Sequence, residues 1–405
     1  MTAAAALVDI RRVFPWVAVA VLATQVGMGI ISPILPIYAK DLGATGLWIG
    51  IIAAGYSISR AVFMAPFGWL SDRRGRKAIL AAGLFTSAGL SFAYIYAGSV
   101  EWLTLVRGFH GLFSAMVIPI ATAYVGELSP EGEEGKWMGY FNTAFFVGFG
   151  VGPLLGGLVA DRLGTAAAFN AMGALNLISF LTVVFFLPEA TVRKARRKVE
   201  VSYRRMFGSG VVRGLFAYRF IFELAMSAVM SFLPVYVGVT LGMDKTMIGA
   251  LIAVHLLVMS FLQVYTGVLS DRMGRRGMIM GGSLTTFALL ATMTLTGNFW
   301  VLLGIMALRA VSSSFTMPAI SAISVEEGRR FGMGSTTSIL GVATSAGMAV
   351  GPVLAGLVAD AANVPAIFYL SAAVGLLGTA LFAWFSRGYR QTVPSPARAA
   401  ARSPE

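Results

Sequence analysis

The stretch GWLSDRRGRK at residues 68–77 returns as GVLSDRMGRR at residues 267–276, 199 positions later. A second stretch, VGPLLGGLVAD at 151–161, returns as VGPVLAGLVAD at 350–360 with the same offset. An offset of about half the 405-residue chain indicates two tandem structural units. Both units are strongly apolar and as long as a domain. The repeat therefore predicts two halves of a membrane bundle rather than the modules of a solenoid.

The composition points to a membrane protein. The mean hydropathy is +0.78, and only 12% of the residues are charged, against roughly 25% in soluble domains. The first apolar run, 14–39, is too long for the core of a cleavable signal peptide. The chain contains no Cys, which excludes disulfides, Cys metal sites and thiol chemistry.

Twelve apolar runs are long enough to cross a bilayer as helices, which need roughly 20 residues each. They are 14–39, 47–70, 77–97, 101–124, 137–161, 166–187, 213–239, 247–270, 276–296, 299–322, 335–359 and 364–386. The predicted fold class is an all-α polytopic membrane protein made of two pseudo-symmetric six-helix bundles. We expect the N-terminal bundle at 1–188, a basic cytoplasmic linker at 189–212, the C-terminal bundle at 213–390 and a disordered cytoplasmic tail at 391–405.

The basic residues are distributed unevenly between the loops. Of 31 Lys and Arg residues, 24 fall on the side that carries both termini and 3 on the other side. Because positive loops stay in the cytoplasm, both termini are predicted to be cytoplasmic, in a bacterial inner membrane. The net charge of +13 is then a topology signal and a surface for anionic membrane lipids, and no nucleic-acid partner is expected.

The doubled loop motif, the six-plus-six spans and the basic central loop resemble the major facilitator superfamily, over about residues 14–387. The Gly/Pro stretch of span five resembles the signature of the drug/proton antiporter branch of that family. The resemblance implies two halves related by a pseudo-twofold axis along the membrane normal, with the substrate cavity between them.

The loop motif is predicted to be a gate latch. Asp72 lies at the end of span two, where its carboxylate can face the positive N-terminus of a neighbouring helix. The resemblance implies span eleven as that neighbour, and the basic residues would pair with Glu131, Glu133 and Glu134. The alternative is that the motif only enforces topology. Its residues are Gly68, Asp72, Arg73, Gly75, Arg76 and Lys77, with Gly267, Asp271, Arg272, Gly274 and Arg275 in the second copy.

The Gly/Pro motif carries no functional side chain. Its glycines allow another helix to approach closely, and its proline removes a backbone hydrogen bond, so we expect a helix bend that opens or seals one side. The alternative is small-residue packing alone. The motif comprises Gly148, Gly152, Pro153, Gly156 and Gly157, with Gly347, Gly351, Pro352 and Gly356 in span eleven.

Ionisable groups inside spans are costly and are functional candidates. Arg107 belongs to a stretch, Leu103 to Gly111, that resembles the family's span-four motif, in which an Arg serves proton coupling. His110 stands where that motif often has Gln, and an imidazole can carry a proton. Glu223 is the one carboxylate well inside a predicted span and is a candidate proton carrier; the alternative is an i,i+4 pair with Arg219.

Further polar residues inside spans are candidates for the substrate cavity. Arg60 and Arg309 are deep cations, and several buried cations against one carboxylate hint at an anionic or zwitterionic substrate. Several drug antiporters have an acidic residue in span one, where this chain offers Gln25. The remaining candidates are Asn142, Asn176, His255 and Gln263.

These features predict a secondary transporter that exports an amphipathic or drug-like small molecule in exchange for protons. We expect a monomer in membrane lipid, without cofactor, metal or enzymatic activity. A proton-coupled uptake symporter is the main alternative, and a non-transporting sensor or assembly subunit is a remote one. The chain has no G-x-x-x-x-G-K-[ST] loop for an ATP-driven pump, and neither H-E-x-x-H nor G-x-S-x-G for a hydrolase.

Overall fold

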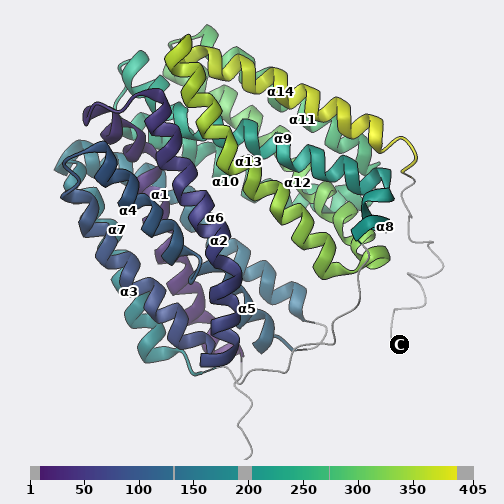
Figure 1. Cartoon of the computed structure of the whole chain (residues 1–405), viewed down its shortest axis with the longest axis horizontal. Coiled ribbons are helices and arrows are strands. Elements are labelled where there is room, and N and C mark those ends of the chain that lie inside the picture. Colours follow the sequence, from purple (N-terminus) through teal and green to yellow (C-terminus); the bar gives the residue numbers. More distant parts are fainter. Residues whose placement is uncertain (1–9, 131–132, 190–202, 273, 390–405) are drawn as a thin grey trace, which may run out of the picture.

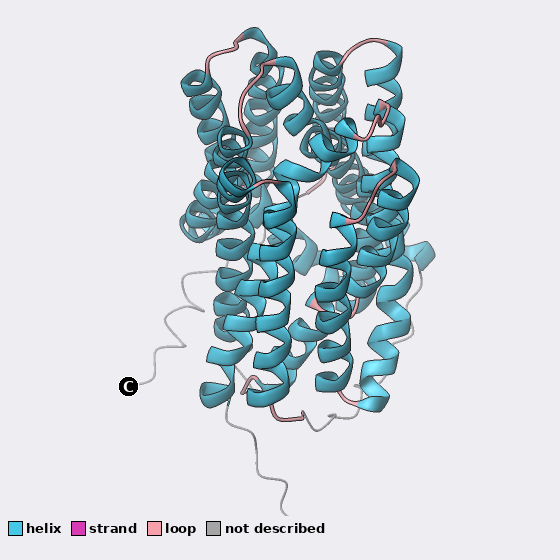
Figure 2. Ribbon diagram, turned by 90° about the vertical axis from the view of Figure 1, so that its left-hand side faces the viewer, coloured by secondary structure: helices cyan, strands magenta, loops and turns pink. Residues whose placement is uncertain are grey.

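The computed structural model describes residues 10–130, 133–189, 203–272 and 274–389, and all regular secondary structure within these ranges is helical (Figures 1 and 2). Twelve helical segments are long and apolar enough to cross a membrane, which confirms the predicted number of spans. The tail 391–405 and most of the linker lie outside the described residues.

The first six spans form one bundle. Its helices are α1 (Ile10–Asp41), α2 (Gly46–Arg74), α3 (Arg76–Ile95), α4 (Val100–Ser114), α5 (Ile118–Leu128), α6 (Glu134–Leu163) and α7 (Thr165–Phe186). The predicted span 101–124 is not one helix, because it is interrupted between α4 and α5. Pro119 has no N–H to donate to the carbonyl of Ala115, so the regular ladder stops there. Met116 and Val117 instead bond to carbonyls three residues back.

The second six spans repeat this arrangement. A short helix in the linker, α8 (Tyr203–Gly208), precedes α9 (Gly210–Val235), which ends in the π-turn η1 (Tyr236–Thr240). The others are α10 (Lys245–Arg272), α11 (Arg275–Thr292) with the 3-10 turn η2 (Met293–Leu295), α12 (Phe299–Phe331), α13 (Met333–Ala361) and α14 (Val364–Phe385). Helix α12 continues nine residues past the predicted end at 322, since a helix does not stop where its side chains become polar.

The two halves meet through two pairs of helices. Because each span reverses the chain direction, Ile10 and Phe385 lie on the same side of the bundle, here called the termini side; the other is the far side. Helix α2 packs on α13, and α6 packs on α10. Figure 1 shows the first half in purple to blue beside the second half in teal to yellow.

Close packing on the far side depends on glycine. A Cβ on Gly50 of α2 would overlap the backbone of Pro352 in α13. A Cβ on Gly249 of α10 would overlap the backbone of Pro153 in α6. Gly249 is 199 residues after Gly50, and Pro352 is 199 residues after Pro153, so the two contacts are copies of each other. Two repeat-related helix contacts, α2 with α13 and α10 with α6, therefore close the far side.

Candidate functional site

A cavity of about 440 Å³ lies between the two halves. This volume is in the range of pockets that hold drug-sized molecules. Its wall is mainly apolar, with side chains such as Met28, Phe149, Met226 and Leu256. Six polar candidates from the sequence line it: Gln25, Arg60, Arg107, His110, Asn176 and Glu223.

The polar wall of the first half is built around Tyr56 of α2. The Arg107 guanidinium of α4 stacks over the Tyr56 ring, with its carbon 4.3 Å from the ring centroid. The Tyr56 hydroxyl is 2.8 Å from the Ser114 hydroxyl. Arg60 follows Tyr56 by one helical turn and lines the same cavity. Tyr56 and Arg60 therefore both face the cavity from α2.

The side chain of His110 is buried and contacts two tyrosines. Its Nδ1 lies 3.0 Å from the Tyr94 hydroxyl, and its ring packs edge-on against Tyr56. Tyr94 is itself stacked on Phe169, with ring centroids 5.2 Å apart. The imidazole is 4% exposed, so its position is fixed by packing as well as by its hydrogen bond. This arrangement fixes His110 beside Tyr56 and Tyr94, and its part in proton coupling stays a prediction.

The second half contributes one carboxylate to the cavity, Glu223 of α9. The alternative prediction is an ion pair between Glu223 and Arg219, one helical turn earlier. Among the described residues no ion pair joins the two. Arg219 lines a second cavity of about 350 Å³, which shares Tyr56, Ser57 and Arg60 with the first. The second cavity continues between α2 and α13 toward the termini side, along residues such as Met64 and Thr337. The second cavity therefore adjoins the central cavity on its termini side.

Four sequence candidates lie outside the wall of the central cavity. Arg309 of α12 is fully buried, and three Met sulfurs surround its guanidinium: those of Met226, Met293 and Met306, at 3.3–3.6 Å. His255 is buried with its Nδ1 3.3 Å from the Met306 carbonyl oxygen. Asn142 is exposed on α6, and Gln263 is partly buried on α10. The sequence could not give the rotation of these helices.

Two carboxylates on the far side connect the halves directly. Asp161, the last residue of the first Gly/Pro stretch, accepts the backbone N–H groups of Lys245 at 3.2 Å and Thr246 at 2.6 Å, at the start of α10. Asp360, its counterpart, accepts those of Gly46 at 2.6 Å and Leu47 at 2.8 Å, at the start of α2.

A helix N-terminus carries unpaired N–H groups and partial positive charge, so each carboxylate stabilises a helix of the opposite half. Sequence reasoning assigned no role to this pair. The signal was available, because both end the same repeated stretch, 199 residues apart. The two contacts close the far side in the conformation described here.

The glycines of the Gly/Pro motif lie in helix–helix interfaces. Gly148, Gly152 and Gly156 face α1, where a Cβ on any of them would meet the α1 backbone. Gly157 faces Lys245 of α10 instead. In the second copy, Gly347 and Gly351 face α9, and Gly356 faces Gly46 of α2. Helices α6 and α13 run uninterrupted through Pro153 and Pro352, so close packing is what the structure shows, and the functional bend stays a prediction.

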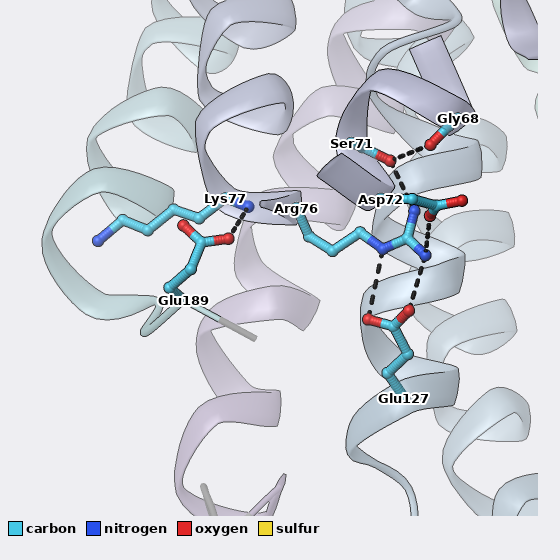
Figure 3. A network of polar contacts seen from close by, with 7 residues as sticks. All are labelled: Gly68, Ser71, Asp72, Arg76, Lys77, Glu127 and Glu189. Carbon is cyan, nitrogen blue, oxygen red and sulfur yellow. Dashed lines mark hydrogen bonds and ion pairs between the residues drawn. The ribbon is translucent and has the colours of Figure 1, made fainter. Parts of the chain in front are cut away.

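The loop motif on the termini side holds its own half together (Figure 3). Arg76 forms ion pairs with Asp72 at 2.6 Å and with Glu127 at 2.7 Å, and donates to the Ser71 hydroxyl at 2.6 Å. The Lys77 backbone N–H donates to Glu189 at 3.2 Å. Arg73 stacks on Trp69, 3.9 Å from the ring centroid.

The acidic partners differ from those expected. Among the described residues, Glu127 and Glu189 are the acids that contact the motif, and Glu133 pairs with Lys136 at 3.6 Å instead. Glu131 and the side chain of Glu134 lie outside the described residues, whereas Glu127 lies on α5. The Asp72 partner is Arg76, so the contact with span eleven stays a prediction for another conformation.

The second copy of the loop motif contains an ion pair equivalent to Arg76–Glu127. Arg275 pairs with Glu326, and these residues are 199 positions after Arg76 and Glu127. The Tyr389 hydroxyl also donates to Glu326, at 2.6 Å. Burial, followed by the hydrogen bond to Glu326, raises the pKa of Tyr389 to about 12, so it stays a donor. The side chains of Asp271 and Arg272 lie outside the described part of the chain.

A bundle of twelve spans in the described residues, with a cavity between two repeat-related halves, is the arrangement of a membrane transport protein. The chain belongs to the Major Facilitator Superfamily, whose family model matches residues 17–244 and 215–404. This result confirms the expected family and fold class.

Relatives that match most of the chain include transport and drug-resistance proteins. An uncharacterized MFS-type transporter of Methanocaldococcus jannaschii is 30% identical over 363 residues, covering 86% of this chain and 92% of that protein. The quinolone resistance protein NorA of Staphylococcus aureus is 25% identical over 374 residues, covering 88% and 92%.

Solved structures share the fold at low identity. A bacterial homolog of the human lysosomal transporter Spinster, in an inward-facing and unoccupied conformation, superposes with a TM-score of 0.79 at 14% identity, covering 94% of this chain and 97% of that one. The human organic anion transporter MFSD10 gives 0.66 at 18% identity, covering 92% and 99%.

Proposed function

We propose that this transporter exports an amphipathic small molecule in exchange for protons, by alternating access of the central cavity to the two sides of the membrane. The observation that carries the proposal is a single titratable carboxylate, Glu223, in the wall of a mainly apolar cavity. A group of this kind can hold a proton or stabilise a substrate, and the exchange of one for the other couples the two fluxes.

The two sides of the cavity differ in a way that fits this cycle. The far side is closed by the Asp161 and Asp360 contacts, whereas the second cavity leads toward the termini side. The charge asymmetry of the loops supports a cytoplasmic termini side, in which case this conformation faces inward and is ready to load cytoplasmic substrate. The other conformation requires both far-side contacts to break.

Two sequence similarities support export rather than uptake. The Gly/Pro stretch of span five resembles the signature of the drug/proton antiporter branch. In addition, the quinolone resistance protein NorA is 25% identical across nearly the whole chain. A quinolone is therefore the first compound to test.

The test uses purified protein in proteoliposomes with imposed proton gradients of both signs. The panel contains a quinolone and neutral, cationic, anionic and zwitterionic aromatic compounds. Antiport predicts that compounds accumulate on the acidic side of the membrane, because protons leave that side as substrate enters. Accumulation on the alkaline side would identify a symporter, and accumulation under neither gradient would exclude proton coupling. Fusion reporters at both termini, read in cells, test the orientation separately.

A further inference from the structure

The charges on the cavity wall are divided between the two halves. The first half contributes two guanidinium groups, Arg60 and Arg107, and the second half contributes one carboxylate, Glu223. These three are the Lys, Arg, Asp and Glu side chains among the residues lining the central cavity. A ligand in the cavity thus meets a cationic wall on one side and an anionic group on the other.

The guanidinium groups have unused hydrogen-bonding capacity. Nε of Arg60, and Nε and Nη1 of Arg107, are buried without a hydrogen-bond partner in the described part of the protein. No carboxylate of the described residues lies within ion-pair distance of either side chain. Both arginines are partly exposed, but a buried N–H group without a hydrogen-bond partner is unfavourable, so a bound anionic group that accepts from these nitrogens would be stabilised.

The Tyr56 ring explains why the donors remain free. Its face attracts the Arg107 guanidinium, while its hydroxyl is already engaged by Ser114. Tyr56 therefore holds Arg107 through its ring, and Nε and Nη1 of Arg107 keep their hydrogen-bonding capacity. The planar fork of donors suits a carboxylate, which can accept two parallel hydrogen bonds.

If protons are exchanged at Glu223, the part of the ligand that lies beside Glu223 must have a particular charge. A purely anionic ligand would bind better when Glu223 is protonated, because the cavity then has more positive charge. Proton and ligand would then bind together and move together, which is symport. For antiport the ligand must compete with the proton, and a cationic group beside Glu223 does so.

We propose that the cavity takes an amphipathic zwitterion. Its carboxylate lies on the guanidinium pair of the first half, its ammonium lies on Glu223 of the second half, and its apolar body lies against side chains such as Met28 and Phe149. This ligand bridges the two halves and satisfies the unpaired donors. The inference rests on the proposed function, because the ammonium is required by proton exchange.

The test is equilibrium dialysis with the protein in lipid nanodiscs at pH 7, with empty nanodiscs as the blank. Four probes share one aromatic body: 6-(aminomethyl)-2-naphthoate, 2-naphthoate, 2-(aminomethyl)naphthalene and 2-(hydroxymethyl)naphthalene. The zwitterion should bind tightest. Loss of either charge should weaken binding roughly 10- to 100-fold, as expected for one hydrogen-bonded charged group.

Two variants give a crosswise pattern that misfolding cannot produce. Arg60→Gln should weaken the zwitterion and 2-naphthoate and leave the amine unchanged. Glu223→Gln should weaken the zwitterion and the amine and leave 2-naphthoate unchanged or tighter. Arg162→Gln, at an exposed position on the far side, is the matched control and should change none of them.

Three results would overturn the inference. Equal binding of 2-naphthoate and the zwitterion would remove the cationic subsite. Equal binding of the amine and the zwitterion would remove the anionic subsite. Binding of no probe above the empty nanodiscs would exclude this ligand class. The assay contains no proton gradient, so a failure of antiport would appear only in the proteoliposome experiment and is distinguishable from each of these.

Discussion

The far-side carboxylates should set the balance between the two conformations, which Asp161→Ala combined with Asp360→Ala tests. Each carboxylate accepts two backbone N–H groups at the start of a helix in the opposite half. An interaction of this kind contributes about 1 kcal/mol, with little added from the helix dipole at an exposed position. Loss of both removes about 2 kcal/mol from the closed far side, a roughly 30-fold shift of the equilibrium toward an open far side.

The shift can be measured as distances between spin labels by double electron–electron resonance. The chain has no Cys, so engineered pairs need no background substitutions. Tyr96 and Leu295 are repeat-related positions on the far side, 80% and 74% exposed. Trp69 and Val268 form the corresponding exposed pair on the termini side. The double variant should lengthen the first distance and shorten the second.

Asp244→Ala is the matched control. Asp244 accepts the Met247 N–H at 2.7 Å, so it caps α10 from within the same half. Its loss should weaken the helix start by a similar amount, yet leave both distance distributions unchanged. If the double variant also leaves them unchanged, the carboxylates do not hold the far side closed, and the reasoning from helix capping is refuted.

Further variants test the interface, the loop and the polar wall. Gly50→Leu and Gly249→Leu should each reduce transport about 10-fold or more, since overpacking costs roughly 1–3 kcal/mol in the closed far side; normal transport by either would contradict the close-packing account. Asp72→Asn should insert normally, because acids contribute little to orientation, yet transport more slowly; a normal rate would make the motif a topology signal only. Arg107→Ala should abolish measurable transport, whereas His110→Gln should change the rate less than about threefold, because an amide can still bond the Tyr94 hydroxyl; the reverse order would refute the assigned roles.

The fold could be predicted because its two signals are strong. Apolar runs of membrane length gave the number of spans, and the 199-residue repeat gave the two halves. Helix ends were less predictable, since α12 continues beyond its apolar stretch and the span at Pro119 is interrupted. These features depend on capping and backbone bonding rather than on hydropathy.

The sequence predicted several residues of the cavity wall, but not which candidates face the cavity. Arg60, Arg107 and Glu223 could be found because charge inside a span is rare, and they line the cavity. Asn142 and Arg309 satisfy the same criterion but face elsewhere, because helix rotation depends on packing that one sequence does not reveal. Asp161 and Asp360 were overlooked because they stand at span ends, where acids are common. Repeat symmetry at span ends is therefore a signal worth reading.

Glu223→Gln in proteoliposomes tests whether the proton is exchanged at Glu223. The measurement compares uphill accumulation, under an imposed proton gradient, of a compound that the wild type accumulates, with its exchange at equal pH on both sides. The variant should lose the uphill accumulation and retain the exchange, because a glutamine cannot release a proton while the cavity can still change sides. Uphill accumulation at the wild-type rate would show that the proton is carried elsewhere and would contradict the account.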